Sequence, residues 1–410
     1  MGIDPHGDGG AKPRPTPLSG VRVLDLTNVL AGPFCCHQLA HMGADVIKVE
    51  APGRGDLARQ LGADPALNSK GMGVSFLAQN AGKKSVTVNF KHPEGKALFL
   101  RLVETADVVV ENFRPGVMTR LGLGYEVLKG HKPDLIYCAI SGFGQDGPWV
   151  DRPAYDQIVQ GVSGVMSITG DTDSAPLRVG YPVADTVGGM TAAFAVASAL
   201  NARPRGAFID CSMLESVLAT MGWVVSNHLI AGVEPGANGN ENPTSAPSGT
   251  FRTGDGLINI AANKDEQWVL LTDFLGLAAL RDRPDYRTRE DRKRNRMALR
   301  SEIEDALADR SARDLAQALN AIGVPAGAVM SVPEVLAHPQ VAERGLMTRY
   351  ADVPGVGRDI EVVNTGVKLD GAPLTVATPP PQLGEHAGEV WRSLGLSVED
   401  IAALADRGAI

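Results

Sequence analysis

The residue best placed to do chemistry is a carboxylate at the start of an apolar stretch. Asp185 follows an extended run, Pro176 to Val183, and precedes the small-residue stretch Met190 to Leu200. It suits a helix N-cap, because its side-chain oxygens can accept hydrogen bonds from the free N–H groups of the first turn. Those N–H groups and the helix dipole should keep it ionised near neutral pH. The two glycines at 188–189 let another molecule approach. Asp185 is therefore either a nucleophile or simply a helix cap.

A second group of candidates follows a predicted buried strand at 107–111. Asn112 begins a polar turn, and Arg114 and Arg120 lie one helical turn or so apart beyond it. Ligands of parallel sheets bind at the carboxyl ends of strands. The two guanidinium groups match phosphate oxygens, and Phe113 offers a flat face to a base. The alternative is a polar loop with solvated arginines. Three lysines add positive charge near neighbouring strand ends: Lys83, Lys84 and Lys91.

A glycine motif follows another predicted strand. Gly142 to Gly147 fits the pattern GxGxxG. In a dinucleotide site this motif must open a helix whose N-terminus holds the pyrophosphate. Pro148, Trp149 and Pro153 follow instead and indicate a loop. A nicotinamide or flavin site therefore loses support, although a glycine-rich loop beside a ligand stays open. The sequence contains no GxSxG elbow, P-loop or HExxH motif, which disfavours hydrolases and kinases.

The elements that must position these residues form an α/β pattern. Strand, helix and strand at short spacing predict a parallel sheet with crossover helices. Strands are expected at 21–26, 45–50, 85–89, 107–111, 134–140 and 207–211, and helices at 33–42, 93–105, from Asp185 to 201, and at 213–230. The segment 51–84 between them is polar and glycine-bearing, and is predicted to be a long functional loop.

The second half of the chain predicts a smaller domain. Residues 231–248 are dense in Gly, Asn, Pro and Ser and mark the clearest break. A strand at 257–261 and mostly helices follow, and the charged stretch 281–296 is expected to be a solvated surface. A strand at 324–330 is expected to lead back to the first domain. Short strands, a Pro-rich turn at 379–381 and two helices close the chain.

Composition excludes several classes of function. The 410 residues suggest two or three domains, and 44% hydrophobic with 21% charged residues is an ordinary globular profile. A net charge of -8 argues against a general nucleic-acid or membrane binder. The four cysteines lie in apolar surroundings without disulfide or CxxC spacing, as expected in a reduced compartment. Cys35, Cys36 and His37 are interpreted as packing, not as metal ligands. Residues 1–17 lack the apolar region of a signal peptide and predict a disordered extension, and no stretch predicts a membrane span. The expected location is the cytoplasm.

Taken together, these segments resemble the class III CoA-transferases, a family that includes formyl-CoA, carnitine and dicarboxylate CoA-transferases and the related methylacyl-CoA racemases. The resemblance runs from about Leu18 to the C-terminus. Several separated motifs in the right order make it specific. They are Leu18 to Leu26, Ala31-Gly-Pro, Gly43 to Glu50, Val110 to Gly116, Gly142-Phe-Gly, Ala154-Tyr-Asp, Asp185, and Leu383-Gly-Glu-His386.

The resemblance implies a covalent mechanism, with Asp185 as the nucleophile that forms an acyl anhydride and then an aspartyl-CoA thioester. It implies an α/β fold with a large Rossmann-like domain built from both chain ends (18–225 and 330–410) and a small α+β domain at 226–329. It also implies a homodimer of interlocked chains. The substrates are an acyl-CoA, such as succinyl-CoA or another dicarboxylic acyl-CoA, and a small carboxylic acid. No metal and no tightly bound cofactor are implied.

The resemblance also implies a set of CoA contacts. Leu30 and Ala31 match a loop beside the CoA chain, and the segment 88–91 matches the nucleotide end. The complete set is Leu30, Ala31, Val88, Asn89, Phe90, Lys91, Asn112, Phe113, Arg114, Arg120, Ser141, Gly142, Phe143 and Gly144. Formyl-CoA transferases differ from this chain: they have glutamine in place of Leu30, a glutamate near Gln145, and a glycine-only run where this chain has 236–248. Formyl-CoA and oxalate are therefore disfavoured as substrates. A mobile loop that shields the intermediates from water is still expected at 231–248.

Three alternatives stay open. Racemases of the family move a proton α to the thioester with a histidine base, and that histidine matches Tyr155. Tyrosine, with an ordinary pKa of about 10, is a poor base at neutral pH, which favours transfer over racemisation. A CoA-binding module without turnover would keep the 112–120 loop but would not need Asp185. An NAD-dependent oxidoreductase rests only on the glycine motif.

Overall fold

The computed structural model describes residues 16–410, so the extension predicted at 1–17 lies outside it except for its last two residues. The chain divides into two compact units. The large unit contains the segments up to Ser163, Gly180–Trp223 and Arg344–Ile410, and the small unit contains Gly164–Val179 and Val224–Glu343. The boundaries thus fall after 223 and 343 rather than after 225 and 329. The short segment 164–179 belongs to the small unit.

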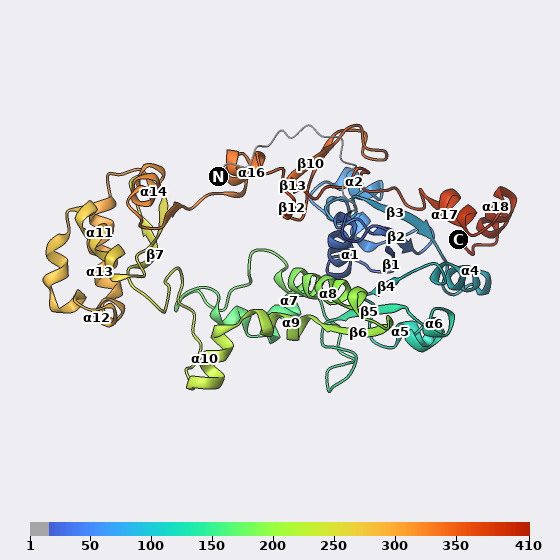
Figure 1. Ribbon diagram of the computed structural model, residues 1–410, viewed down its shortest axis with the longest axis horizontal. Helices are drawn as coiled ribbons and strands as arrows, with labels where there is room; N and C mark the ends of the chain where they lie inside the picture. The colour runs from blue at the N-terminus through green and yellow to red at the C-terminus, as the bar shows by residue number, and fades with distance from the viewer. Residues whose placement is uncertain (1–15) are drawn as a thin grey trace. The chain divides into compact units, whose positions relative to one another are not determined.

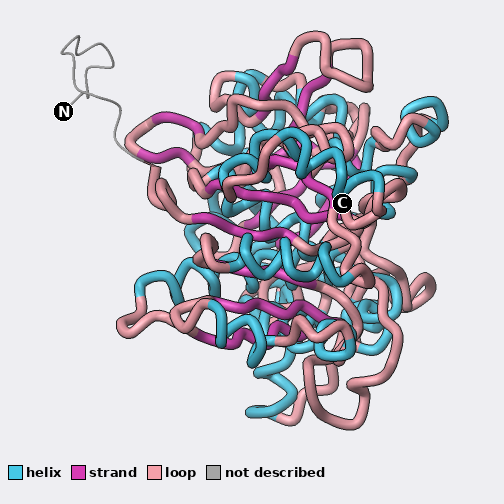
Figure 2. Tube along the Cα trace, turned by 90° about the vertical axis from the view of Figure 1, so that its right-hand side faces the viewer, coloured by secondary structure: helices cyan, strands magenta, loops and turns pink. Residues whose placement is uncertain are grey.

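A six-stranded sheet organises the large unit, and Figures 1 and 2 show its strands side by side. All five strand pairs are parallel, in the order β3-β2-β1-β4-β5-β6. The strands are β1 (Arg22–Asp25), β2 (Asp45–Glu50), β3 (Lys83–Thr87), β4 (Val108–Glu111), β5 (Ile136–Ser141) and β6 (Ala207–Ser212). The predicted parallel α/β sheet is therefore confirmed.

Both faces of the sheet are covered by helices, so most of its strand residues are buried, including the charged Lys48 and Lys83. One face buries Leu24, Ile47 and Val109 against helix α4 (Pro93–Val103) and the C-terminal helix α17 (Ala387–Ser393). The opposite face packs against α1 (Ala31–His41) and α8 (Val183–Asn201). Cys35 and Cys36, on α1, are buried and free, as expected for packing residues.

Shorter elements complete this part of the chain. The predicted loop at 51–84 contains three short helices, η1 (Leu57–Gln60), α2 (Pro65–Ser69) and α3 (Val74–Leu77). The helix predicted at 213–230 is divided, because Gly222 adopts a φ of 50° between α9 (Met213–Thr220) and α10 (Trp223–Ala231). The remaining helices are α5 (Val117–Arg120), α6 (Tyr125–His131), α7 (Asp156–Val162) and η2 (Val165–Ile168).

The small unit has its own antiparallel sheet and core. Strand β8 (Leu257–Ala261) pairs with β7 (Ser248–Arg252) and β9 (Ala326–Ala328). The prediction that the strand near 324–330 leads back to the first domain was wrong, because β9 completes this three-stranded sheet. The sheet packs on helices that the sequence predicts only as a group: α11 (Asp265–Leu275), η3 (Ala278–Asp282), η4 (Pro284–Tyr286), α12 (Arg289–Arg294), α13 (Arg296–Leu307) and α14 (Ala312–Ala321).

The charged stretch 281–296 is not a uniformly solvated surface. Arg292 is 1% exposed and donates to Asp265 Oδ1 at 2.6 Å and to the Ala246 carbonyl oxygen at 3.0 Å. Its guanidinium also lies over the Trp268 ring. A charged residue in this core is stabilised by these partners, so its alternating sequence pattern was not diagnostic of exposure.

The C-terminal segment returns to the large sheet. After α15 (Val332–Leu336) and α16 (Pro339–Ala342), β10 (Met347–Tyr350) pairs with β11 (Ile360–Val363), and β12 (Lys368–Leu369) with β13 (Ala372–Pro373). Helices α17 and α18 (Val398–Asp406) then close the edge beside β3. There the Asn89 amide donates to the Ala409 carbonyl oxygen at 2.9 Å.

Among the described helices, α8 bears on the expectation that no uninterrupted apolar stretch is long enough to span a membrane, and Asp185 and Thr186 interrupt its apolar run. This 19-residue helix is long and apolar enough by length and composition. Its small residues pack against α1, α9, β5 and β6, and a core helix of this kind passes the same test.

Candidate active site

The candidate site lies where the strand order changes direction. From β1 the chain builds the sheet outward through β2 and β3, and it then returns to place β4 on the other side of β1. Open α/β sheets bind ligands outside the carboxyl ends of strands at such a switch point. The segments leaving β1 and β4 are joined there. The Asn28 amide donates to Asn112 Oδ1, and Asn112 Nδ2 donates to the Asn28 carbonyl oxygen, both at 2.8 Å.

Close helix packing brings Asp185 to this point. A Cβ atom added at Gly189 would collide with the Ala31 carbonyl oxygen, and one added at Gly188 would lie 2.8 Å from Met213 Cγ. The glycines therefore allow α8 to approach both the start of α1 and the start of α9. Asp185 lies four residues before Gly189, on the same face of α8. The nucleophile candidate therefore lies one helical turn before the contact of α8 with Ala31.

Asp185 is not the N-cap of its helix, which was one of the two roles that the sequence left open. Helix α8 begins at Val183 with Pro182 in the N-cap position, so Asp185 is the third helical residue. The cap is supplied by α7: Asp156 Oδ1 accepts from the Ala184 amide at 2.9 Å and from the Asp185 amide at 3.4 Å. Gln160 Nε2 donates to Asp156 Oδ2 at 2.7 Å. Sequence reasoning missed Asp156, because its partners lie 28 and 29 positions away.

This arrangement changes the electrostatics of Asp185. Burial and the nearby Asp156 carboxylate raise the pKa of Asp185 to about 7. The prediction that Asp185 stays fully ionised near neutral pH was therefore wrong. The favourable N–H groups of the helix start are already occupied by Asp156, so they do not lower the pKa of Asp185. A carboxylate with a raised pKa is also more basic than an ordinary one, which suits a nucleophile.

Buried ion pairs hold the strand ends below the site. Lys83 Nζ on β3 lies 2.8 Å from Asp25 Oδ2 on β1, and Lys48 Nζ on β2 lies 3.8 Å from Asp25 Oδ1. Burial raises the pKa of Asp25, but the two lysines outweigh burial and lower that pKa to about 2. Lys83 is 1% exposed, so the expectation that it contributes charge to a ligand was wrong. Lys84 pairs instead with Asp45 and Glu389.

The predicted CoA contacts lie at the carboxyl edge of the sheet, but their side chains differ in availability. Arg114, Arg120 and Lys91 are exposed. Val88 is 2% exposed, and Phe90 packs edge-on against Phe99, so these two offer only backbone groups.

Several of the remaining predicted CoA contacts, which follow β4 and β5, already have partners within the protein. Asn112 is paired with Asn28, and Phe113 packs against the core. The Gly144 amide donates to Ser141 Oγ at 2.9 Å, and Phe143 packs edge-on against Trp149.

The GxGxxG segment forms a loop, as predicted. Gly142 lies against Ala154, where an added Cβ would collide, and the Leu214 amide donates to the Gly142 carbonyl oxygen at 3.0 Å. Gly144 has a φ of 93° and Gly147 one of 83°, which favour glycine. No helix begins within 142–147. The segment therefore ties β5 to the start of α9 and does not have the geometry of a dinucleotide fingerprint.

The comparison with protein families decides the identity. A family model described as CoA-transferase family III matches residues 18–387. The chain belongs to CoA-transferase family III. It is 40% identical to "Succinate--glutarate CoA-transferase" of Agrobacterium fabrum over 93% of this chain and 96% of the relative. It is 37% identical to the mouse "Succinyl-CoA:glutarate CoA-transferase" over 92% of this chain and 86% of the relative.

A solved structure shows the same fold for this CoA-transferase. A CAIB/BAIF family protein from Brucella suis superposes with a TM-score of 0.80 and 35% identity, over 93% of this chain and all of that one. Among residues 16–410 of the CoA-transferase, no group of three or more His, Cys, Asp or Glu side chains is arranged to hold a metal ion.

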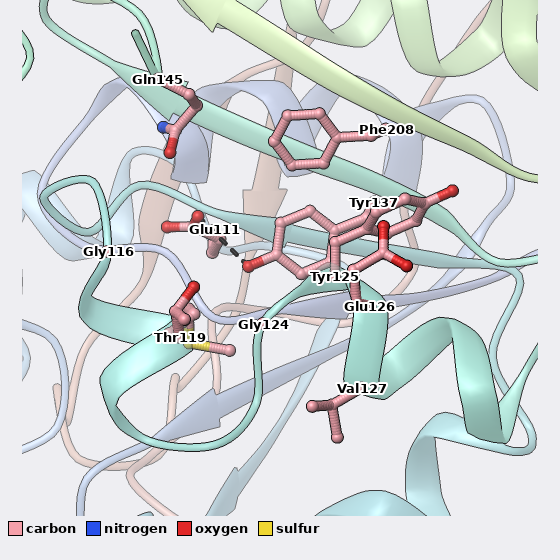
Figure 3. Close-up of a pocket in the computed structure, with 11 residues that line it drawn as sticks. Glu111, Gly116, Thr119, Gly124, Tyr125, Glu126, Val127, Tyr137, Gln145 and Phe208 are labelled. Atoms are coloured by element: carbon pink, nitrogen blue, oxygen red, sulfur yellow. Dashed lines mark hydrogen bonds between the residues drawn. The ribbon is translucent and has the colours of Figure 1, made fainter.

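A separate pocket of about 370 Å³ lies beside the loop after β4 (Figure 3). At its base the buried Glu111 accepts from the Phe113 amide at 2.7 Å and from the Tyr137 hydroxyl at 3.3 Å. Burial raises the pKa of Glu111 to about 7. Asp185 does not line this pocket. In the CoA-transferase these contacts brace the start of the 112–120 loop.

Proposed function

We propose that this enzyme transfers CoA from succinyl-CoA to a free dicarboxylate through a covalent intermediate on Asp185. The observation that carries the proposal is the position of Asp185 in the first turn of α8, one turn before the contact of Gly189 with Ala31 at the switch point. No other carboxylate among the proposed site residues occupies this position.

The first half-reaction uses Asp185 as nucleophile. One carboxylate oxygen attacks the thioester carbonyl carbon of the donor; a C–O bond forms, the C–S bond breaks, and CoA leaves as thiolate. The thiolate then attacks the aspartyl carbonyl carbon of the resulting anhydride. A C–S bond forms there, the anhydride C–O bond breaks, and the donor acid leaves as carboxylate. One difficult exchange becomes two easier steps.

The second half-reaction runs in reverse with the acceptor. The acceptor carboxylate attacks the aspartyl thioester, which gives a new anhydride and CoA thiolate. The thiolate attacks the acceptor acyl carbon, which releases the new acyl-CoA and the Asp185 carboxylate. No proton is transferred in either half, so the reaction needs an ionised Asp185 but no general base.

The remaining residues bind and orient the substrate. We assign the CoA phosphates to the exposed Arg114, Arg120 and Lys91, because guanidinium and ammonium groups favour phosphate oxygens. Leu30 and Ala31 border the reacting end. In the described chain no side chain caps the start of α1. Pro33 has no N–H group and the Phe34 amide donates to the Leu30 carbonyl oxygen, so we assign the stabilisation of the negative charge that develops on the attacked carbonyl to the N–H groups of Ala31 and Gly32.

The names of the relatives suggest the substrates. The Agrobacterium fabrum and mouse enzymes are both named for succinate or succinyl-CoA and for glutarate. We therefore propose succinyl-CoA as donor and glutarate, or a dicarboxylate of similar length, as acceptor. The experiment is a CoA-transfer assay in which succinyl-CoA is supplied with dicarboxylates of two to six carbons. Transfer to none of them would reject this substrate class.

Intact mass spectrometry tests the covalent step. The protein is mixed with succinyl-CoA and then treated with hydroxylamine or borohydride, which trap aspartyl thioesters and anhydrides. We expect a trapped adduct at Asp185, its loss in Asp185→Ala, and its retention in Asp151→Ala, which changes an exposed aspartate. Proton exchange at the α-carbon in deuterated water without any adduct would instead establish racemisation, with Tyr155, 67% exposed, near the base position.

We also propose a homodimer. Apolar side chains on α7 and α8 are exposed in the single chain, among them Phe194 at 74% and Ile158 at 50%. A contiguous apolar surface is typical of an interface. Light scattering should give the mass of two chains, and Phe194→Glu should shift it toward one. A wild-type protein with the mass of one chain would contradict the proposal.

A further inference from the structure

The turn between β1 and α1 contains a residue in an unfavourable backbone conformation. Val29 has a φ of 67°, in the left-handed region. A β-branched residue is rarely found there, because its Cβ substituents crowd the backbone. Glycine would adopt this φ without strain. Val29 immediately precedes Leu30 and Ala31, which face Asp185 in the proposed function.

Buried charged residues hold this turn from one side. The Val29 amide donates to Asp56 Oδ1 at 2.9 Å. Asp56 Oδ2 lies 2.9 Å from Lys48 Nζ, and Lys48 Nζ donates to the Thr27 carbonyl oxygen at 2.8 Å. Asp56 and Lys48 are 1% and 0% exposed. Because both side chains are packed and paired, neither can follow the turn if it moves.

The turn is also held from the opposite side. Asn112, at the end of β4, makes its two hydrogen bonds to the Asn28 backbone. The Thr27 amide and hydroxyl both donate to Asp25 Oδ1. Consecutive residues 27, 28 and 29 are therefore each fixed by a different buried or partly buried side chain. Strain of this kind persists only where the surroundings over-determine the backbone, and it gathers at functional sites.

We propose that Asp56 is a positioning residue: through its hydrogen bond to the Val29 amide, it holds Val29 in the left-handed conformation, and the 28–31 turn that results sets Ala31 against α8 and Asp185. Lys48 acts through Asp56 by fixing the carboxylate and the Thr27 carbonyl. The inference rests on the proposed function for its effect on rate, but the conformational effect stands independently of it.

Kinetics of three variants test the effect on rate. We expect Asp56→Ala to lower kcat for transfer from succinyl-CoA about ten- to hundred-fold with a smaller change in KM, because misplacement of groups near the reacting atoms has effects of that size. Val29→Gly removes the steric opposition to the left-handed φ. Added to Asp56→Ala, it should raise kcat at least about three-fold above that of Asp56→Ala alone, since glycine adopts that conformation without strain.

Asp64→Ala is the matched control. Besides the Val29 amide, Asp56 Oδ1 accepts from the Ala58 amide at 2.8 Å and so caps η1. Asp64 lies in the same 51–84 segment and likewise caps a short helix, accepting from the Ala66 and Leu67 amides. It makes no hydrogen bond to the 28–31 turn in the described structure. A loss of kcat in Asp64→Ala equal to that in Asp56→Ala would overturn the inference, because it would reflect general loosening of the segment. Failure of Val29→Gly to restore any activity would also overturn it.

Hydrogen exchange tests the conformation without any reaction. In Asp56→Ala, the backbone amides of peptides spanning 27–34 should exchange at least about ten-fold faster, whereas those of β2 should not. Unchanged exchange at 27–34 would reject the inference even if the enzyme is active. If the wild-type enzyme transfers no CoA, the proposed function fails, and the exchange result alone decides the positioning role.

Discussion

Two carboxyl groups lie at the first turn of α8: that of Asp185, within the turn, and that of Asp156, on α7. Only Asp156 accepts hydrogen bonds from the backbone N–H groups of this turn. Asp185 is left beside a like charge in a partly buried position. A carboxyl group in that position loses a proton less readily. The folded protein therefore keeps a proton on Asp185 between pH 3.8 and about 7 that the unfolded chain releases. The stability from this group is fully present below pH 3.8 and is lost as pH rises through about 7.

Activity should have the opposite dependence on pH. Because only ionised Asp185 attacks the thioester, kcat/KM should rise with pH to a plateau above about 7. Asp156→Asn keeps an oxygen that can accept from the helix but removes the like charge. The midpoint of its pH profile should move to lower pH while staying above 3.8, since burial remains. Asp151→Asn should leave the midpoint in place, and an unchanged midpoint in Asp156→Asn would contradict this account.

At the scale of elements, the contact between α1 and α8 depends on a glycine. In Gly189→Ala the new methyl group meets the Ala31 carbonyl oxygen, which belongs to backbone and cannot move aside cheaply. Overpacking costs about 1–3 kcal/mol, offset by about 1 kcal/mol of better helix propensity. We expect a net loss of about 0–2 kcal/mol in unfolding free energy and at least about a ten-fold loss of kcat. In Gly180→Ala the added methyl group meets open space, so that variant should change neither denaturation nor activity.

The three strands β1, β2 and β3 are linked by buried charges as well as by backbone hydrogen bonds. Asp25→Ala would leave Lys48 and Lys83 without that carboxylate in a site with 0–1% exposure. Removing one partner from a buried pair costs about 3–5 kcal/mol. Because the pKa of Asp25 is lowered, its contribution is present above pH 3.8 and is lost as pH falls through about 2.

Denaturant titration measures this cost. The matched control is Asp45→Ala, which removes a carboxylate from Arg22 and Lys84, each about one-third exposed. Exposed pairs contribute about 0–1 kcal/mol. Equal losses of unfolding free energy in Asp25→Ala and Asp45→Ala would show that burial does not strengthen the ion pairs of Asp25.

The elements differ in how far local sequence predicts them. Strand β2 has the predicted bounds, because a short segment with Val46, Ile47 and Val49 directly follows Gly43, which ends the preceding helix, and Ala44. The sequence analysis did not predict strand β7 (Ser248–Arg252), because this strand is short, mixed in polarity and only partly buried. The start of α8 was misplaced because its cap is on α7. The choice of sheet for β9 depends on its pairing with β8, which lies more than sixty positions earlier.

Local sequence also predicts only part of the candidate site. The positions of Leu30 and Arg114 beyond strand ends follow from the motifs, because parallel strands all end at one edge. Asp185 follows no strand of the large sheet, and only the small-residue stretch after it indicates that it lies at a helix start. The sequence did not predict the raised pKa of Asp185 or the burial of Lys83, since both arise from contacts between segments distant in the chain. Val29 carried no sequence signal, because valine gives no indication of a left-handed φ.

At the scale of the whole molecule, the C-terminus closes the sheet begun by the N-terminal half. Trp391 on α17 is fully buried in the core formed by the strands and α4. Its indole Nε1 has no hydrogen-bond partner among the described residues. Trp391→Ala should therefore lower the unfolding free energy by about 3–5 kcal/mol, whereas Trp391→Phe should cost about 1–2 kcal/mol, since it loses no hydrogen bond.

Chemical denaturation followed by circular dichroism distinguishes these outcomes. If Trp391→Phe destabilises the protein as much as Trp391→Ala, the indole N–H of Trp391 must donate a stabilising hydrogen bond, which contradicts the prediction. If neither variant changes stability, the C-terminal helices do not contribute to the core of the large sheet.

The same closure sets a delay during synthesis. The Ser85 amide donates to His386, which is 301 positions later, and the Asn89 side chain donates to the Gly408 carbonyl oxygen, which is 319 positions later. Neither hydrogen bond can form before these residues are synthesised. At roughly 5–20 residues per second, a ribosome delivers those partners on the order of tens of seconds after β3 emerges. Throughout that interval the outer edge of β3 lacks its C-terminal cover. During synthesis, the unpaired N–H and C=O groups of this edge are therefore open to pairing with another strand, which is the liability of an uncovered edge strand.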